Sequence, residues 1–255
     1  MAKSKIEWTE VTWNPVTGCT KISPGCKNCY AEKMHQRLMS MGQKKYSKPF
    51  SEVVLHNDSI REPLSWKKPK MIFVNSMSDL FHKDIPFTFI DSIFEVMGYC
   101  TQHTFQVLTK RPRRLLEYLA WTKIFDAWSK WGHIWIGTSV ENKEMAEERI
   151  PELLLFKTLH QDIKVWISAE PLLEHIFLPA EWIDKARYGG TGTLDWVVVG
   201  GESGPNKRPF DCDWARSMRD ACKAANVPFF MKQVDKVIPI PEDLQIREYP
   251  KENKF

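Results

Sequence analysis

Apolar and polar positions follow two alternating patterns along the chain. Short runs rich in β-branched and aromatic residues predict buried strands, and segments with apolar residues every three or four positions predict amphipathic helices. We expect strands at 6–13, 53–55, 70–74, 105–108, 133–136, 164–167, 195–199 and 228–231. We expect helices at 30–41, 143–149 and 213–225, and further helices that begin at 86 and at 113.

A strand followed by a helix, repeated along a chain, is typical of a parallel sheet. The predicted fold class is therefore α/β, with a parallel (β/α) full or partial TIM-like barrel. An open doubly wound sheet is the alternative, because periodicity does not report whether the sheet closes. We expect residues 1–236 to form this single barrel-like domain. Residues 237–255, with three prolines and dense charge, are expected to pack as an extended arm.

Composition narrows the class of protein. The chain has 255 residues, 43% of them hydrophobic, and a net charge of +4, which is too small to indicate a polyanion partner by itself. Its six cysteines have wide, irregular spacing, unlike a secreted disulfide framework. The first residues lack the apolar core of a signal peptide, and no apolar run approaches the length of a membrane span. We therefore expect a cytoplasmic protein without a membrane partner.

Three of the cysteines lie within eleven residues near the start of the chain, at Cys19, Cys26 and Cys29. Pro24-Gly25 predicts a tight turn between the first thiol and the other two. Such a turn lets three sulfurs converge, as a metal or an iron–sulfur cluster requires. Three protein ligands would leave one coordination position open for chemistry or substrate. There are two alternatives to this interpretation. The three cysteines could be part of a zinc site that a remote His or Cys completes, or they could be free thiols in a turn-rich loop.

Polar residues follow several predicted strands at the point where each strand ends. In a parallel barrel these ends share one rim, where sites are built. Taken singly, each of these residues has a structural explanation, as a helix cap or as a partner in an ion pair. Their repetition at successive strands favours a binding rim. The candidates are Ser76, Asp79, Lys110, Ser139, Glu141, Glu170 and Glu202.

The three cysteines occur together with further motifs, at 13–15, 108–112, 139–142, 168–173 and 200–204. With these motifs the sequence resembles the phage Gp37/Gp68-type family over nearly the whole chain, and that family resembles radical S-adenosylmethionine enzymes. The resemblance implies a radical-SAM-like barrel in which three cysteines hold a [4Fe–4S] cluster. It also implies that S-adenosylmethionine binds the fourth iron and that reductive cleavage produces a 5′-deoxyadenosyl radical. An electron donor such as flavodoxin or ferredoxin is implied as a partner.

The sequence departs from the common radical S-adenosylmethionine pattern at three places. Six residues separate Cys19 from Cys26 where three are usual, and Asn28 stands where an aromatic residue usually precedes the third cysteine. The Gly-Gly-Glu signature that ends at Glu202 comes near the sixth strand, whereas in most members it follows the second. Glu202 therefore does not simply inherit the amino-binding role. For the ribose of S-adenosylmethionine we rank Ser139 and Glu141 above it.

Basic segments flanked by aromatic residues are consistent with a DNA or RNA substrate. They lie at 44–46, 66–70 and 110–114, where phosphate contacts and base stacking would explain them, although solvated loops would explain them as well. The leading hypothesis is a radical S-adenosylmethionine-type enzyme that modifies or repairs nucleic acid or a nucleotide. The alternative is a zinc- or iron–sulfur-stabilised nucleic-acid-binding or redox-sensing protein without catalysis.

Overall fold

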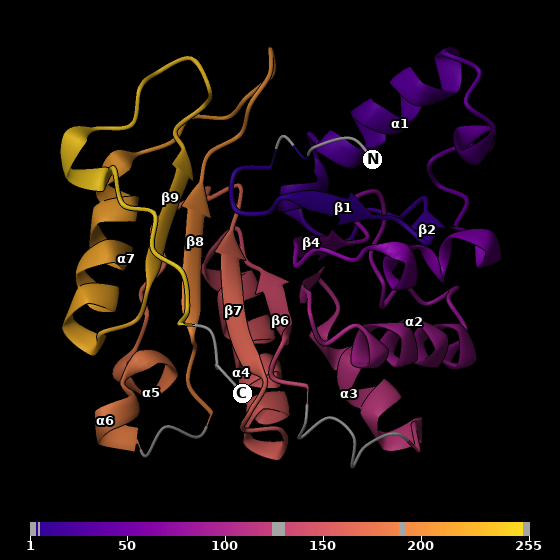
Figure 1. Cartoon of the computed structure of the whole chain (residues 1–255). Coiled ribbons are helices and arrows are strands. Elements are labelled where there is room, and N and C mark those ends of the chain that lie inside the picture. Colours follow the sequence, from indigo (N-terminus) through magenta and orange to yellow (C-terminus); the bar gives the residue numbers. More distant parts are fainter. Residues whose placement is uncertain (1–3, 5, 124–130, 189–191, 252–255) are drawn as a thin grey trace. The chain divides into compact units, whose positions relative to one another are not determined.

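A computed structural model describes residues 4, 6–123, 131–188 and 192–251, which divide into two compact units. Unit 1 comprises Met1–Ile22 and Cys29–Trp135, and unit 2 comprises Ser23–Asn28 and Ile136–Phe255. The strands of the main sheet have the order β1-β4-β5-β6-β7-β8-β9. The neighbours β7, β8 and β9 can be followed in Figure 1. Consecutive strands are therefore neighbours once the small β2–β3 pair is set aside, as expected for successive β/α units.

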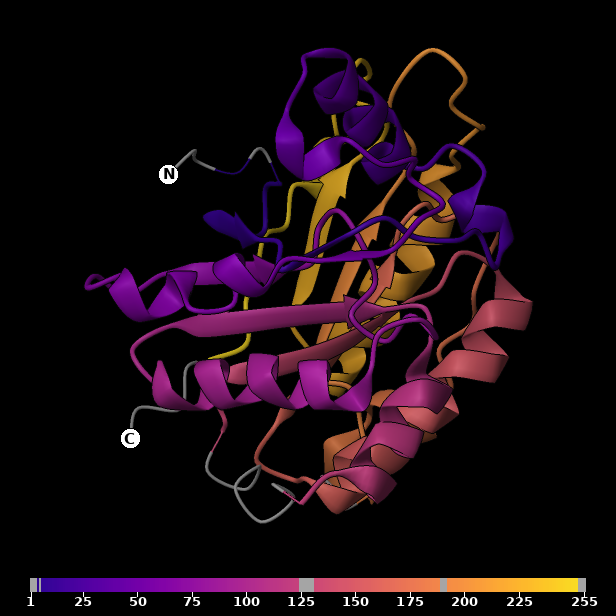
Figure 2. The same ribbon diagram turned by 90° about the vertical axis from the view of Figure 1, so that its right-hand side faces the viewer.

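Unit 1 is built on three parallel strands. Val11 of β1 lies opposite Ile72 of β4, and Met71 of β4 lies opposite Thr104 of β5. The helix that follows β4 buries Phe89, Ile90, Ile93, Phe94 and Met97, the apolar face that its sequence predicts, and it runs alongside β5 (Figure 2). The elements are β1 (Val11–Trp13), β2 (Val16–Thr17), α1 (Tyr30–Ser40), η2 (Lys44–Tyr46), β3 (Val54–Leu55), η3 (Asn57–Ser59), η4 (Glu62–Ser65), β4 (Met71–Val74), α2 (Phe87–Tyr99), β5 (Thr104–Thr109) and α3 (Pro112–Trp121).

Unit 2 continues the parallel pattern. Trp166 of β7 lies opposite Trp196 of β8, and Val197 of β8 lies opposite Phe229 of β9. β7 and β8 are buried along their whole length, and β8 is accordingly a continuous apolar run in the sequence. The elements are η1 (Pro24–Cys26), β6 (Ile134–Ser139, in this unit from residue 136), α4 (Lys143–Leu159), β7 (Lys164–Ala169), α5 (Ala180–Ile183), α6 (Lys185–Tyr188), β8 (Trp196–Gly200), α7 (Cys212–Ala225), β9 (Phe229–Gln233) and η6 (Glu242–Leu244).

Several predicted boundaries were wrong. The strand expected at 6–13 begins only at Val11, and the run at 53–55 pairs antiparallel with β2 instead of joining the parallel strands. The helix expected at 143–149 continues to Leu159 through Pro151, because buried residues such as Leu153 and Phe156 extend its packed face. The helix expected at 213–225 begins at Cys212, and Asp211 caps it by accepting a hydrogen bond from the Asp213 amide at 2.8 Å.

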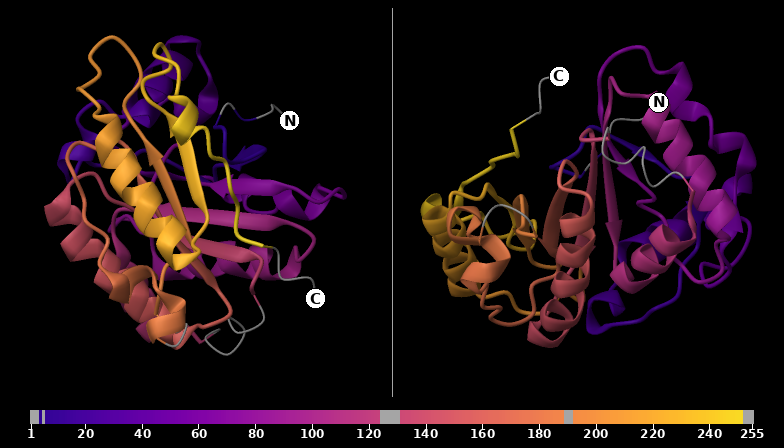
Figure 3. Two further views of the ribbon diagram at one scale, coloured as in Figure 1. Left: turned by 90° about the vertical axis from the view of Figure 1, so that its left-hand side faces the viewer. Right: turned by 90° about the horizontal axis from the view of Figure 1, so that it is seen from below.

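The segment near the end of the chain packs beside β9 in unit 2 (Figure 3). Arg247 forms an antiparallel bridge with Phe230, and the Met231 amide donates to the Ile246 carbonyl at 2.9 Å. The Glu248 carbonyl accepts from the Trp196 indole at 2.8 Å. This pairing covers backbone groups that β9 would otherwise expose at the edge. The domain boundary near residue 236 stays a prediction, and residues 252–255 of the expected arm lie outside the described residues.

Among the described residues there is no helix with the length and apolar character needed to cross a membrane.

Candidate metal and cofactor site

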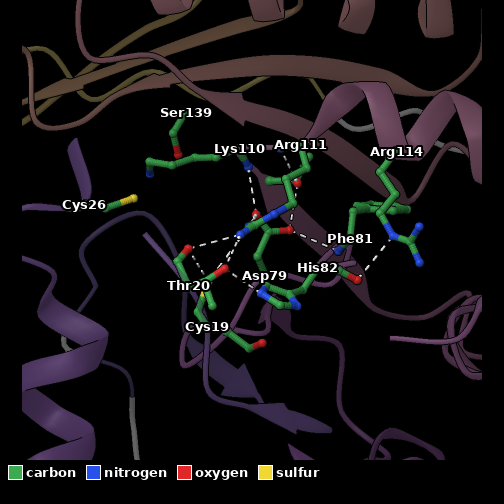
Figure 4. Close-up of polar contacts among 12 residues, drawn as sticks. Cys19, Thr20, Cys26, Asp79, Phe81, His82, Lys110, Arg111, Arg114 and Ser139 are labelled. Atoms are coloured by element: carbon green, nitrogen blue, oxygen red, sulfur yellow. Dashed lines mark hydrogen bonds and ion pairs between the residues drawn. The ribbon is translucent and has the colours of Figure 1, made fainter. Parts of the chain in front are cut away.

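In unit 1, Asp79 is the centre of a hydrogen-bond network after β4 (Figure 4). One carboxylate oxygen accepts from the Thr109 hydroxyl at 2.7 Å and from the Phe81 amide at 3.0 Å. The other accepts from the Lys110 amide at 3.0 Å and forms an ion pair with Arg111 at 2.8 Å. Four donors therefore hold this buried carboxylate, and it joins the end of β4 to the end of β5.

Arg111 links this network to the first cysteine of the motif. Its guanidinium donates from Nη1 to the Cys19 sulfur at 3.8 Å and from Nη2 to the Thr20 carbonyl at 3.1 Å. The Thr20 hydroxyl in turn lies 2.7 Å from Nε2 of the fully buried His82. Burial works to lower the pKa of Arg111, but Asp79 and Cys19 raise it overall, so the guanidinium keeps its charge beside the sulfur.

The backbone before Cys19 requires glycine. Gly18 has a φ of +88°, and a Cβ there would lie 2.1 Å from the Glu52 carbonyl oxygen. The Cys19 amide then donates to the Phe50 carbonyl at 2.7 Å. Cys29, also in unit 1, is the N-cap residue of α1, and its carbonyl accepts from the Lys33 amide at 3.2 Å. The helix predicted at 30–41 is therefore confirmed, and it begins directly after the last cysteine of the motif.

Cys26 belongs to unit 2, within residues 23–28, which we call the Cys26 loop. The Pro24–Cys26 turn is helical, with the Cys26 amide donating to the Ser23 carbonyl at 3.0 Å. The Ser23 hydroxyl lies 3.7 Å from the Cys26 sulfur. The tight turn predicted from Pro24-Gly25 is therefore present.

Two carboxylates that the sequence assigned to the cofactor hold this loop. Glu141 has no exposed surface, accepts from the Gly25 amide at 3.1 Å, and forms an ion pair with Arg149 at 3.1 Å. Glu202 accepts from Asn28 at 2.8 Å and forms a close ion pair with Arg208, whose Nη1 donates to the Pro24 carbonyl at 3.0 Å.

The electrostatics of Glu202 follow from these contacts. Burial works to raise its pKa, but hydrogen bonds from Arg208 and Asn28 outweigh burial and lower the pKa to about 2. Glu202 is therefore ionised at neutral pH and remains an acceptor for the loop.

The remaining rim candidates also have contacts inside their own units. In unit 1 the Ser76 hydroxyl donates to Asn14 at 3.1 Å, and the Lys110 side chain is half-buried. In unit 2 the Ser139 carbonyl accepts from Arg149 at 2.8 Å. Glu170 accepts from Ser168 at 2.9 Å and pairs with Lys232 at 2.7 Å. Their roles toward a cofactor stay predictions.

The thiols suit a metal or cluster by their chemistry. All six cysteines are thiols and not disulfides, and the three of the motif are partly exposed, whereas Cys100 and Cys222 are buried. Burial raises the pKa of Cys222 to about 12, which makes it a poor ligand. Within the described ranges no group of three or more His, Cys, Asp or Glu residues is arranged to hold a metal ion. Cys19, Cys26 and Cys29 as a ligand set therefore stay a prediction.

The structure revises the interpretation of the basic segments. Tyr46 and Trp66 are buried, so the base stacking expected of these two aromatic residues is wrong. Arg111 is engaged as described above. Arg114 donates to the His82 carbonyl at 3.2 Å and lies over the Phe87 ring, 4.5 Å from its centroid. These arginines stabilise unit 1, which the sequence alone did not indicate.

Comparisons with known proteins support the fold. A family model described as "Protein of unknown function (DUF5131)" matches residues 3–248. No curated protein matches the sequence. A solved structure of spore photoproduct lyase, a cysteine-to-serine mutant, is similar with a TM-score of 0.55 and 12% identity, covering 91% of this chain and 78% of that one. The predicted fold class, an α/β parallel sheet of the partial-barrel kind, is confirmed. The resemblance to the phage Gp37/Gp68-type family stays a prediction.

Proposed function

We propose that this chain, which belongs to the family described as "Protein of unknown function (DUF5131)", is a radical S-adenosylmethionine-type iron–sulfur enzyme. The observation that carries the proposal is the three-cysteine motif before α1, in a chain that shares its fold with a lyase. Cys19, Cys26 and Cys29 would hold a [4Fe–4S] cluster. When bound, the cluster and S-adenosylmethionine would supply a 5′-deoxyadenosyl radical that removes a hydrogen atom from the substrate.

The residues of the chain have separate tasks in this proposal. Arg111 donates a hydrogen bond to the Cys19 sulfur, and hydrogen bonds of this kind tune the potential of a cluster. Asp79 holds Arg111 beside Cys19, and Glu141 and Glu202 hold the Cys26 loop, so we assign these three carboxylates to building the site. The proposed contacts to S-adenosylmethionine are Ser76, Lys110, Ser139 and Glu170.

The decisive experiment is anaerobic reconstitution with iron and sulfide, followed by S-adenosylmethionine and a reductant. We expect visible cluster absorption, bound iron, and 5′-deoxyadenosine as a product. Replacement of any one motif cysteine by alanine should abolish iron binding, because a cluster held by two thiolates is easily lost. Cys212→Ala is the matched control, since Cys212 is also a partly exposed thiol. Full iron content in the three single variants would refute the proposal.

The same experiment separates the alternatives. A protein that binds zinc and takes up no iron would be a zinc-stabilised module. A protein that assembles the cluster but leaves S-adenosylmethionine intact would be a redox-sensing or binding protein.

We further propose a nucleic-acid substrate, in view of the exposed Lys44, Lys67, Lys68 and Arg113 in unit 1. The name of the similar lyase describes an enzyme acting on the spore photoproduct, which is consistent with this class. Binding to single- and double-stranded DNA and RNA should weaken as salt rises. The variant Lys67→Gln/Lys68→Gln should lower the salt slope by about one for each phosphate contact removed. Salt-independent binding, or none, would exclude this substrate class.

A further inference from the structure

A fully buried ion pair stands at the end of β6 in unit 2. Glu141 has 0% exposure and Arg149 has 1%. Arg149 donates from Nη1 to both the Ser139 carbonyl at 2.8 Å and the Glu141 carboxylate at 3.1 Å. Burying two charges is costly unless their hydrogen bonds are specific, so the location of this pair calls for an explanation.

The second oxygen of the Glu141 carboxylate accepts from the Cys26 loop. Oε1 accepts from the Gly25 amide at 3.1 Å, and Gly25 immediately precedes Cys26. A Cβ on residue 25 would meet the Glu141 carboxyl carbon at 2.9 Å, so glycine is what permits this approach. The carboxylate is thus anchored by Arg149 on one side and holds a backbone amide on the other.

Three further hydrogen bonds hold the Cys26 loop on either side of this point. Arg208 donates to the Pro24 carbonyl at 3.0 Å. Asn28 donates to Glu202 and to the Asn206 carbonyl, both at 2.8 Å. Because these contacts bracket Gly25, the amide held by Glu141 lies between two anchored points and directly precedes Cys26.

We propose that Glu141, supported by Arg149, is a positioning residue that fixes the orientation of the Cys26 thiol through the Gly25 amide. This role rests on the proposed function for its purpose, which is to present Cys26 as a ligand. It differs from the ribose contact expected from sequence. A carboxylate without exposed surface, with both oxygens engaged, is suited to holding backbone and not to exchanging partners with a cofactor.

The test measures how fast the Cys26 thiol of the full-length apo protein is alkylated by iodoacetamide. Mass spectrometry follows the modification of each cysteine separately. Glu141→Ala should raise the Cys26 rate about tenfold, as loss of one charge-assisted hydrogen bond allows. Gly25→Ala should raise it similarly, because the added methyl group displaces the carboxylate. Glu141→Gln keeps an acceptor oxygen and should restore most of the protection. Glu148→Ala, at an exposed position on α4, the helix that carries Arg149, should leave the rate unchanged.

A double-mutant cycle sharpens the test. If Gly25 and Glu141 act through one contact, the double variant Gly25→Ala/Glu141→Ala should change the alkylation rate of Cys26 no more than either single substitution does. The buried Cys100 and Cys222 report global opening, and they should stay protected in every variant. Unchanged Cys26 rates in both single variants, additive effects, or parallel increases at Cys222 would each overturn the proposal.

Iron loading distinguishes this inference from the proposed function. After reconstitution, Glu141→Ala should bind less iron per chain than the natural protein, and Glu141→Gln should recover it. If the natural protein binds no iron while the alkylation pattern is as expected, the cluster proposal fails and the positioning role stands. If iron loading is normal in Glu141→Ala and Cys26 reactivity is unchanged, the positioning role fails and the cluster proposal stands.

Discussion

A carboxylate–arginine ion pair lies near Cys19 in unit 1 and another lies near Cys26 in unit 2, but the two pairs contact different groups. In unit 1 the Asp79–Arg111 pair reaches the thiol itself, with the guanidinium 3.8 Å from the Cys19 sulfur. In unit 2 the Glu141–Arg149 pair reaches only the backbone beside Cys26, through the Gly25 amide. A positive group at the sulfur alters its electronic properties, whereas a carboxylate at the amide alters its position.

The difference indicates that the two cysteines respond to mutation in different ways. Substitutions around Cys19 should change the stability of unit 1 and the properties of the bound group. Substitution of Glu202, which holds the Cys26 loop together with the 23% exposed Arg208, should change access and loading with a smaller effect on stability. Three predictions test this contrast, from the largest expected effect to the smallest.

The largest effect is expected at Asp79. Asp79→Ala removes an acceptor for four donors and leaves the Arg111 guanidinium, only 13% exposed, without its carboxylate. Breaking a buried pair of this kind should lower the free energy of unfolding by about 3–5 kcal/mol. Glu202→Ala in unit 2 should cost only about 1–3 kcal/mol, because its loop partners can turn to water.

Urea unfolding followed by circular dichroism measures both losses. Asp79→Asn keeps an acceptor oxygen and should fall between Asp79→Ala and the natural protein. Equal losses for Asp79→Ala and Glu202→Ala would contradict the contrast between the two regions.

The next effect concerns the reduction potential of the reconstituted protein. Arg111→Gln removes a positive hydrogen-bond donor from the Cys19 sulfur, so the potential should fall by tens of millivolts. Arg114→Gln is the control, because Arg114 donates to backbone carbonyls in the same unit and has no contact with the thiol among those described. A potential that shifts equally in both variants would assign the effect to overall charge and not to the contact.

The smallest effect is a pH dependence at Glu202. Its pKa is lowered from 4.5 to about 2, so its contribution to stability is present above 4.5 and is lost as pH falls toward 2. The difference in unfolding free energy between the natural protein and Glu202→Gln should therefore be constant above about pH 5 and shrink below it. Chemical unfolding at a series of pH values measures it, and a difference that grows on acidification would contradict the assignment.

The sequence alone determined the order of strands and helices and the cysteine loop before α1. A buried strand such as β8 is an apolar run whatever its neighbours are, and the buried face of α2 recurs at helical spacing. Pro24-Gly25 predicts its turn locally. These features depend on residues close together in the chain, so local pattern is sufficient to predict them.

Partners far apart in the chain were decided only by the tertiary structure. Gly25 and Glu141 are 116 positions apart, Arg111 and Cys19 are 92 apart, and Arg208 and Pro24 are 184 apart. The sequence showed that Glu141 follows a strand, but a carboxylate at a strand end can face a ligand, a cation or a backbone amide with the same local pattern. Burial of Glu141 with Arg149 favoured the backbone amide, because a buried carboxylate needs a hydrogen-bond donor for each of its oxygens.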